Sequence, residues 1–382
     1  MDRKKVRGEA TRLGATTRCM IDLERLRDNV SRISAFARTK GCGIMPVIKS
    51  DGYGHGILEV ARAISGHRIW GLGIFELSEA KLLRAAGIEL PLFLLSGLLG
   101  QDAALAPELD LTVGVVRTEE LDALQAAAHA AKKRVKVHLK VDTGMARYGL
   151  VPEEAAAVAR SMGRWPDIEF EGLYSHMPVA DEPENPFSKG QIEQFLGLAE
   201  RLKGMGLEPR FVHLANSAGL MQIPRGRFNL CRPGIAIYGA GLLKEQLGLA
   251  PVMGLESFIC SLRKLAAGTH VGYGHTFTLA RDSLVALVPA GYDNGYLRGL
   301  SNRAAVLVRG KRAPVIGRIC MKTFLVDVTH IPDAGPGDRV VMLGEQDGGS
   351  IGPDELAEMA GTISYELLCL FGRLNRREYI KG

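Results

Sequence analysis

The chain has 382 residues, of which 46% are hydrophobic and 24% are charged, and its formal net charge is +6. This length predicts a globular protein of two domains, and the composition excludes a disordered chain, a collagen-like chain and a coiled coil. The longest apolar stretch, around Leu90–Leu99, is about half of the ~20 residues that a membrane-spanning helix needs, which excludes a membrane-spanning protein.

Basic residues are scattered along the chain and form no stripe with interleaved aromatic residues. A nucleic-acid partner is therefore not expected, whereas the positive balance favours anionic ligands. The six cysteines include no CxxC pair and have no metal-ligand spacing, which is typical of reduced thiols in a cytoplasmic protein. The polar N-terminus lacks the apolar segment of a signal peptide, so export is not expected.

The first two thirds of the sequence alternate short β-rich runs with segments whose apolar residues recur every three or four positions, as in helices. Eight strands that alternate with helices predict a parallel sheet closed as a (β/α)8 barrel. An open doubly wound sheet is less favoured, because no GxGxxG follows the first strand. The expected strands are Ile44–Lys49, Trp70–Phe75, Leu92–Ser96, Leu111–Val116, Val135–Val141, Phe170–His176, Phe211–Leu214 and Ile235–Tyr238, and the helices between them include Ser78–Ala86, Thr118–Lys132, Pro152–Met162 and Lys189–Met205.

After about Leu243, Val, Thr, Gly and Pro become more frequent, and short strand-like runs lie between turn signals. We therefore place the barrel at residues 18–243 and a mostly β domain at residues 244–382, with residues 1–17 packed on the β domain. The expected elements of the second domain are strands at Leu284–Val288, Ala305–Val308, Phe324–Val328 and Arg339–Met342 and a final helix at Pro353–Ala360.

Polar residues follow several of the predicted barrel strands, at the end of a barrel where active sites form. Lys49 ends the apolar run MPVIK, and a desolvated lysine has a lowered pKa and can bond a carbonyl carbon. Position alone leaves open the alternative that Lys49 extends into solvent. The other polar residues at strand ends are Lys140, Asp142, His176, Asn216, Ser217 and Arg232.

Lys49 lies in VIKSDGYGHG, which resembles the pyridoxal-phosphate lysine motif of the alanine racemases. Further motifs of that family occur in its order, and the resemblance extends from about residue 16 to 378. The family has a barrel followed by a β domain, as predicted here. The other matching segments are KVDTGMARYG (140–149), GLYSHMPVAD (172–181), HLANSAG (213–219), RPGIAIYG (232–239), VGYGHTFT (271–278), GRICM (317–321) and TISYELLC (362–369).

The resemblance implies that Lys49 bonds pyridoxal 5'-phosphate covalently and is one of two catalytic bases. It implies that Tyr273 is the second base and reaches into the partner subunit of a homodimer with shared active sites. Racemisation removes a proton from one face of Cα and returns one to the other, which two bases on opposite faces provide. The remaining cofactor residues that the resemblance implies are Tyr53, His176, Asn216, Ser217, Arg232, Gly234, Ile235 and Tyr365.

Arg232 matches the arginine that contacts the pyridine nitrogen, and His176 matches the residue that supports it. Because a guanidinium only donates hydrogen bonds, the nitrogen stays unprotonated and the cofactor becomes a weaker electron sink. Lys140 matches a lysine that is carbamylated in many members, where it positions Arg147, which holds the substrate carboxylate together with the backbone of Met321. The implied channel residues are Asp181, His213, Tyr292, Arg298 and Arg318.

Three positions depart from the family pattern. Position 179 is Val where Ala is usual, and the usual GYADG reads GYDNG, with Asp293 and Asn294 at its centre. The usual CMD reads CMK, so that Lys322 replaces a carboxylate. Three alternatives follow: Lys322 pairs with Asp293 by an exchange of positions, the substrate preference differs, or activity is lost.

The resemblance therefore implies a cytoplasmic, homodimeric alanine racemase that interconverts L- and D-alanine and supplies D-alanine for peptidoglycan. Lys322 leaves open a racemase of another amino acid, acidic or of broad specificity, or a repurposed and weakly active homologue. A basic-amino-acid decarboxylase of the same fold is disfavoured by the Tyr273 motif. A pyridoxal-phosphate carrier without turnover is disfavoured by the β domain.

Overall fold

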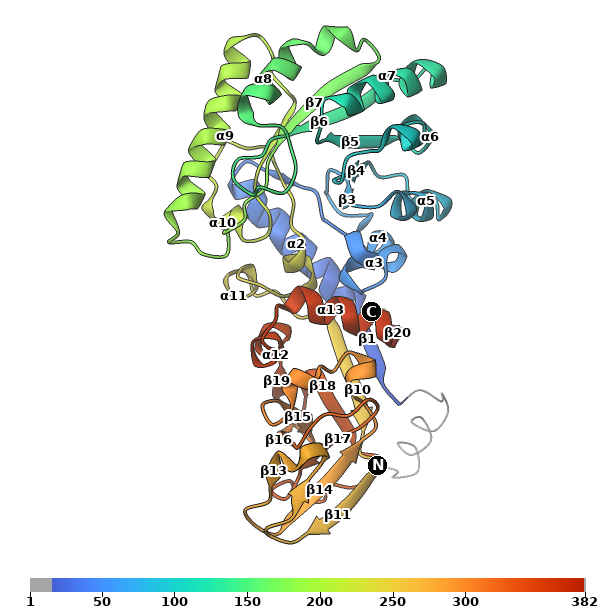
Figure 1. Cartoon of the computed structure of the whole chain (residues 1–382), viewed down its shortest axis with the longest axis vertical. Coiled ribbons are helices and arrows are strands. Elements are labelled where there is room, and N and C mark those ends of the chain that lie inside the picture. The colour runs from blue at the N-terminus through green and yellow to red at the C-terminus, as the bar shows by residue number, and fades with distance from the viewer. Residues whose placement is uncertain (1–15, 381–382) are drawn as a thin grey trace. The chain divides into compact units, whose positions relative to one another are not determined.

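The computed structural model describes residues 16–380, which form two compact units (Figure 1). The barrel unit comprises residues 26–52 and 57–250, and the described part of the β unit comprises residues 16–25, 53–56 and 251–380. We expected residues 1–17 to pack on the β domain. Residues 1–15 of this segment lie outside the described range. Within residues 16–380, no helix has the length and apolar character needed to cross a membrane.

The barrel unit contains eight short parallel strands. Strands β3 to β8 form one sheet in chain order, and β2 pairs with β9. Backbone hydrogen bonds close the ring, because Trp70 N–H donates to Ile44 at 2.8 Å between β3 and β2, and Asn229 N–H donates to Val212 at 3.3 Å between β9 and β8. This confirms the predicted (β/α)8 barrel. The strands are β2 (Gly43–Ile44), β3 (Leu72–Ile74), β4 (Leu92–Leu94), β5 (Leu111–Val115), β6 (Val135–Lys140), β7 (Ile168–Tyr174), β8 (Phe211–His213) and β9 (Leu230–Cys231).

Helices α5 to α9 lie on the outer side of these strands (Figure 1). The apolar spacing in the sequence explains how each helix packs: α4 buries Ile57, Val60, Ala61 and Ile64, which form a single stripe. The helices of the unit are α2 (Leu23–Thr39), α4 (Ile57–Ile64), α5 (Leu77–Ala85), α6 (Leu105–Glu108), α7 (Glu119–Ala131), α8 (Pro152–Arg160), α9 (Pro186–Gly204), α10 (Gly219–Gln222) and α11 (Leu243–Leu247), with a short turn, α3 (Lys49–Tyr53), after β2.

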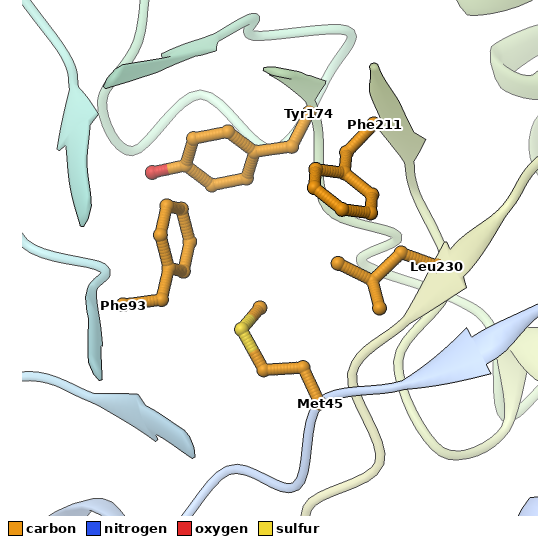
Figure 2. Packing of buried hydrophobic residues seen from close by; sticks show 5 residues of the cluster. All are labelled: Met45, Phe93, Tyr174, Phe211 and Leu230. Atoms are coloured by element: carbon orange, nitrogen blue, oxygen red, sulfur yellow. The ribbon is translucent and has the colours of Figure 1, made fainter. Parts of the chain in front are cut away.

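Large side chains from several strands fill the barrel interior. Figure 2 shows Met45, Phe93, Tyr174, Phe211 and Leu230 converging on one another. The rings of Phe93 and Tyr174 meet edge to face, with centroids 5.2 Å apart. Each such side chain stabilises the fold by about 1.5–3 kcal/mol when it is fully buried. The barrel interior is a packed core, and a ligand site is therefore expected at the end of the barrel.

The eighth predicted strand is wrong. Residues Ile235–Tyr238 form a 3-10 helix, η3, and the eighth strand is β9, which lies earlier in the chain. All four residues of η3 are buried, and a buried apolar run does not by itself distinguish a strand from a helical turn. Gly239, at φ 74°, ends η3 in a left-handed conformation that favours glycine.

The β unit is built on a sheet with the strand order β11-β14-β17-β16-β15-β18-β10-β1-β20, and β19 pairs with β18. Its described strand pairs are antiparallel except β1–β20, which confirms the predicted, mostly β second domain. The elements are β1 (Arg18–Asp22), β10 (Met253–Phe258), β11 (Ser261–Leu265), β12 (His270–Val271), β13 (Phe277–Thr278), β14 (Ser283–Val288), β15 (Ala305–Val308), β16 (Lys311–Ile316), β17 (Phe324–Asp327), β18 (Arg339–Gln346), β19 (Gly349–Ile351), α12 (Pro353–Ala360), α13 (Ser364–Leu374) and β20 (Arg376–Ile380).

The order of elements in the β unit differs from expectation at two places. Strand β1 pairs with β10 and β20 in this sheet, although we expected residue 18 to begin the barrel. Its alternation explains the pairing, because Cys19 and Ile21 are fully buried while their neighbours are partly exposed. Helix α12 has the predicted bounds but is not the final element, since α13 and β20 follow it.

Candidate functional site

Lysine, histidine, serine and arginine side chains gather at one end of the barrel unit. Lys140 is the last residue of β6, His176 and Ser217 follow β7 and β8, and Arg232 follows β9 directly. Lys49 follows the bridge between Val47 and Gly73, which extends the pairing of β2 with β3. Because the carboxyl ends of parallel strands open at the same end of a barrel, the structure brings the sequence-predicted residues together.

The electrostatic surroundings of His176 show how closely these groups gather. Desolvation and the charges of Arg232, Arg147, Lys140 and Lys49 all lower the pKa of His176 well below its usual value. The positive charges of four basic side chains therefore act on one neutral imidazole. This end of the barrel is suited to anionic ligands.

Lys49 begins a turn of unusual backbone conformation. Ser50, Asp51 and Gly52 have φ of 55°, 54° and 64°, so the turn α3 is left-handed. Such a conformation costs about 1–2 kcal/mol for each non-glycine residue, and it occurs mainly where function requires it. The Asp51 carboxylate stabilises the turn by accepting Ile57 N–H at 2.8 Å. Lys49 Nζ lies 5.1 Å from the centre of the Phe75 ring.

The buried carboxylate of Glu79 holds the start of this turn. Its Oε1 accepts Ser50 N–H at 2.6 Å, and its Oε2 accepts Phe75 N–H at 2.8 Å and Glu76 N–H at 3.1 Å. Glu79 thus joins the residue after Lys49 to the end of β3 and the start of α5. The sequence analysis missed it, although an acid at the third position of a helix is a recognisable capping signal.

Arg232 is buried and makes four hydrogen bonds through its two terminal nitrogens. NH1 donates to His213 Nδ1 at 2.7 Å and to the His213 carbonyl at 3.2 Å, and NH2 donates to the carbonyls of Leu214 and Ser175. Burial lowers the pKa of Arg232 to about 10, so it stays protonated at neutral pH. Since a guanidinium has five N–H groups, these bonds leave Nε–H as the donor available for a ligand.

Two histidine assignments need correction. No hydrogen bond joins the His176 side chain to Arg232 among the described residues, although we expected His176 to support it. His213, expected to line a channel, is fully buried and bonds Arg232 directly. His213 is buried because this last residue of β8 points into the barrel, where its ring stacks on that of Tyr174 with centroids 5.2 Å apart.

A hydroxyl and backbone amides meet beside η3. Ser217 Oγ accepts Gly234 N–H at 2.9 Å and Ala236 N–H at 3.3 Å, with Ile235 between them. Asn216 has a different role, because its Oδ1 accepts Gly219 N–H at 2.9 Å and so shapes the loop. Hydroxyl and amide donors in one place are the chemistry that phosphate groups require.

Lys140 and Arg147 flank the ring of Tyr148. Lys140 Nζ lies 5.6 Å and the Arg147 guanidinium carbon 4.9 Å from its centre. Burial and the charges of Arg232 and Arg147 lower the pKa of Lys140 to about 8, although Asp142 opposes the shift. An appreciable fraction of the amine is therefore unprotonated near neutral pH.

The other predicted residues lie in the β unit or at the surface. Tyr53 and Tyr365 are neighbours in the β unit, with ring centroids 5.8 Å apart. Arg377 donates to the carbonyl of Gly54 and so fixes the chain after Tyr53. Asp181 is exposed on the barrel unit. Tyr53 is buried, whereas Tyr365 is 40% exposed.

Three large side chains of the β unit point into solvent. Tyr273, Met321 and Tyr292 are 72%, 56% and 40% exposed. The loops that carry Tyr292 and Met321 are joined, because Tyr292 N–H donates to the Cys320 carbonyl and Asp293 N–H to the Met321 carbonyl, both at 3.1 Å. Hydrogen bonds thus hold the loops of Tyr292 and Met321 together, and Tyr273 lies on a separate turn, η4 (Tyr273–His275).

Two of the predicted channel arginines belong to the same set of loops. The guanidinium of Arg318 lies against the Tyr273 turn, where a Cβ on Gly274 would come within 2.8 Å of its NH1. Arg298 begins the 3-10 turn η6, Arg298–Leu300. The loop residue Asn302 accepts Gly317 N–H at 2.6 Å and so connects the segments that carry the two arginines.

The two departures at the centre of these turns compensate for each other. Lys322 forms an ion pair with Asp293, which confirms the first alternative considered for Lys322. Asn294 faces inward instead, where its Nδ2 donates to Asn375 Oδ1 at 3.2 Å and its Oδ1 accepts Gly291 N–H at 3.3 Å. Asp293 thus lies at the surface next to Lys322, and the charges of the two side chains cancel.

The similarity of this chain to known proteins agrees with the fold and the site described above. The sequence model of the alanine racemase N-terminal domain matches residues 21–241, and that of the C-terminal domain matches residues 252–379. The chain belongs to the alanine racemase family. The alanine racemase of Syntrophobacter fumaroxidans is 40% identical over 365 residues, which are 95% of this chain and 97% of the relative. That of Geobacter sulfurreducens is 37% identical over 369 residues, which are 94% and 96% of the two chains.

A solved alanine racemase has the same fold. The crystal structure of the enzyme from D-cycloserine-producing Streptomyces lavendulae matches with a TM-score of 0.90 at 34% identity and covers 97% of this chain and 98% of that one. The alanine racemase match extends over both the barrel and the β domain, and it assigns the chain to the amino-acid racemases, which are isomerases. A decarboxylase and a carrier without a β domain are therefore disfavoured.

Proposed function

We propose that this chain interconverts L- and D-alanine with pyridoxal 5'-phosphate bonded to Lys49. The observation that carries the proposal is the group of four cations, Lys49, Lys140, Arg147 and Arg232, around His176 at the carboxyl end of the barrel. A phosphorylated cofactor and a substrate carboxylate supply the negative charges that such a site requires. The family and its named members support the reaction.

The donors at the barrel end fit this cofactor. Ser217, Gly234 and Ile235 would hold its phosphate, for which the Gly234 amide would exchange Ser217 Oγ for a phosphate oxygen, and the Nε–H of Arg232 would donate to its ring nitrogen. Bound there, the cofactor would withdraw electrons from the substrate and make the Cα proton removable. Tyr53 and Tyr365 are proposed as further phosphate ligands on the family resemblance.

Each residue of the barrel site has a separate task in this proposal. The amine of Lys49 takes a proton from Cα or returns one to it, and Arg147 binds the substrate carboxylate through paired hydrogen bonds. We also propose that Lys140 carries a carbamate. Its unprotonated amine would bond the carbon of CO2 and lose a proton, and the resulting anion would orient Arg147. A pKa of about 8 makes that amine available.

The exposed residues of the β unit support a homodimer. Tyr273 is 72% exposed and Met321 is 56% exposed, although both are large side chains. We propose that each copy inserts Tyr273 and Met321 into the barrel site of the other, which a two-fold axis provides twice. The D-alanine would serve peptidoglycan synthesis. All six cysteines are free, which supports a cytoplasmic location.

A chiral assay tests which amino acid is the substrate. Purified protein with added pyridoxal phosphate is incubated separately with L-alanine, D-alanine and each other common amino acid, and the enantiomers are separated by chromatography. We expect both forms of alanine to reach an equal mixture and alanine to react at least about tenfold faster than an acidic amino acid. Faster racemisation of aspartate or glutamate would contradict the proposal and favour the acidic alternative.

The Lys322–Asp293 pair gives a second test of substrate preference. Because Asp293 neutralises Lys322, the pair offers no free cation for a second substrate carboxylate. Lys322→Asp would place two carboxylates together, and we expect it to lower the kcat/KM for alanine several-fold while unfolding free energy changes by less than about 1 kcal/mol, since the pair is exposed.

Two further variants show whether repulsion between the two carboxylates causes the effect of Lys322→Asp. Adding Asp293→Ala to Lys322→Asp should restore kcat/KM, because it removes the repulsion, and Lys322→Met alone should have a smaller effect than Lys322→Asp. A sharp rise in alanine turnover with Lys322→Asp alone would show that the native protein is specialised for another substrate.

A further inference from the structure

Four buried polar side chains form a continuous hydrogen-bonded row through the interior of the barrel. Arg232 NH1 lies 2.7 Å from His213 Nδ1, and His213 Nε2 lies 2.8 Å from His138 Nδ1. His138 Nε2 lies 3.2 Å from Glu171 Oε2. Each residue is at most 3% exposed. The row therefore connects the ligand end of the barrel to a buried carboxylate.

The two ends of the row determine the direction of every bond in it. Arginine only donates and an ionised carboxylate only accepts, so each imidazole between them must accept at Nδ1 and donate at Nε2. Arg232 thus donates to His213, His213 to His138, and His138 to Glu171. Both histidines are neutral in this arrangement, and a single tautomer satisfies all three bonds.

The charge states agree with that direction. Burial lowers the pKa of both His138 and His213, which keeps them neutral. Burial opposes ionisation of Glu171, but the hydrogen bond from His138 and the charges of Lys136 and Arg210 outweigh it and hold its pKa below the usual value. Since no carboxylate pairs with Arg232 directly among residues 16–380, Glu171 is the anion to which the row connects it.

Strand β7 is irregular at the position that supplies this carboxylate. Val137 pairs with Phe170 and His138 with Gly172, so Glu171 is the extra residue of a β-bulge. A bulge redirects side chains, and here it accompanies burial of the Glu171 carboxylate beside His138 of β6. A Cβ on Gly172 would lie 2.5 Å from the His138 ring, so the absence of a side chain there makes room for that ring.

Aromatic rings surround the two histidines of the row, whereas Glu171 Oε1 at its end lies 3.7 Å from Lys136 Nζ and 3.9 Å from Arg210 NH1. The His138 ring lies 4.8 Å from Phe93 and 5.8 Å from Phe211, and the His213 ring stacks on Tyr174 at 5.2 Å. In such a low-dielectric core, hydrogen bonds along a chain strengthen one another, and a broken bond leaves an unsatisfied polar group. The row is therefore suited to holding the arginine in one orientation.

We propose that Glu171 is a positioning residue for racemisation, which acts through His138 and His213 to hold Arg232 as a fixed donor toward the ligand. The proposal rests on the proposed function for the identity of that ligand, pyridoxal phosphate. The carboxylate makes His138 a firm donor, which makes His213 a better acceptor for Arg232. Glu171 itself touches neither cofactor nor substrate in this role.

Glu171→Gln tests the proposal, with Glu169→Gln as its matched control. The glutamine keeps the size of the side chain but can donate as well as accept, so the direction of the row is no longer enforced and its negative charge is lost. Glu169 lies two positions earlier on β7, pairs with Arg134 at 3.9 Å and lies outside the row. Its variant removes the same charge from the same strand.

The first readout needs no cofactor. With histidine labelled by 15N, NMR of the unloaded wild-type protein should show His138 and His213 neutral, each with its proton on Nε2. Glu171→Gln should shift both sets of imidazole resonances, and Glu169→Gln should leave them in place. A wild-type spectrum with the proton on Nδ1 of either histidine would overturn the proposal, whether or not the variants fold.

The second readout uses the loaded enzyme. We expect Glu171→Gln to lower kcat for alanine about two- to thirtyfold, to change KM less, and to shift the absorbance of the bound cofactor. Wild-type kcat and absorbance in Glu171→Gln, or equal effects in Glu169→Gln, would overturn the role of Glu171. If the imidazole resonances respond as expected but the wild-type protein racemises no amino acid, the proposed function fails while the hydrogen-bonded row stands.

Discussion

Lys49→Ala is expected to lower alanine racemisation by about a thousandfold or more, because it removes the covalent attachment of the cofactor and one of two bases together. Stability should change little, since the Lys49 side chain is only partly buried and the turn after it is held by Glu79 and Asp51. Chiral assay gives the rate, and urea unfolding gives the free energy of unfolding.

Chemical labelling locates the attachment. Borohydride reduction of the loaded wild-type protein should fix the cofactor on the peptide that contains Lys49, and Lys49→Ala should yield no such adduct. Lys81→Ala, which removes an exposed lysine on α5, serves as the control and should retain both adduct and activity. An adduct mapped to Lys140 or another lysine would contradict the assignment of Lys49.

Mixing two inactive variants is expected to restore activity. If Tyr273 serves the site of the partner subunit, a dimer of one Lys49→Ala chain and one Tyr273→Phe chain contains one site with both lesions and one with neither. Random exchange of subunits makes half of the dimers mixed, so about one quarter of all sites should be intact. Activity should rise from near zero to about a quarter of the wild-type value, as measured after the chains have exchanged.

The control is a mixture that cannot complement. Combining Lys49→Ala with Lys49→Met gives no site with an intact lysine, and its activity should stay at the background of either variant. Mass spectrometry of differently tagged chains verifies that mixed dimers have formed. Background activity in verified mixed dimers of Lys49→Ala and Tyr273→Phe would show that each site is built from one chain.

The sequence was sufficient for the architecture and for the identity of most residues at the barrel end. Alternating apolar patterns predicted strands β3 to β8, because each strand is a short buried run followed by an amphipathic helix. The end-of-strand rule predicted that Lys49, Lys140 and Arg232 would meet, and their charges do act together on His176. The pairing of Lys322 with Asp293 was one of three alternatives that the departures from the family pattern left open, and the structure contains this pair.

What the sequence did not predict depends on three-dimensional pairing. The bulge that buries Glu171 is a shift in register between β6 and β7, and a register cannot be read from one strand. For the same reason, His138 was not among the predicted site residues, and His213 was expected in a channel. A polar residue at an inward position of a barrel strand is the signal that would have directed attention to both histidines.

The pairing of β1 with β20 also bears on how the chain folds during synthesis. Residues 18–22 emerge from a ribosome before the barrel unit, but their parallel partner, residues 376–380, is made after that unit. The segments of the barrel unit, by contrast, are complete once residue 250 has been made. Contacts so distant in sequence form slowly, because a long loop must close before they contribute. We therefore expect nascent chains to hold a protected barrel while the edge of β1 that pairs with β20 is still unpaired, and this edge stays exposed to chaperones and proteases until residues 376–380 have been made.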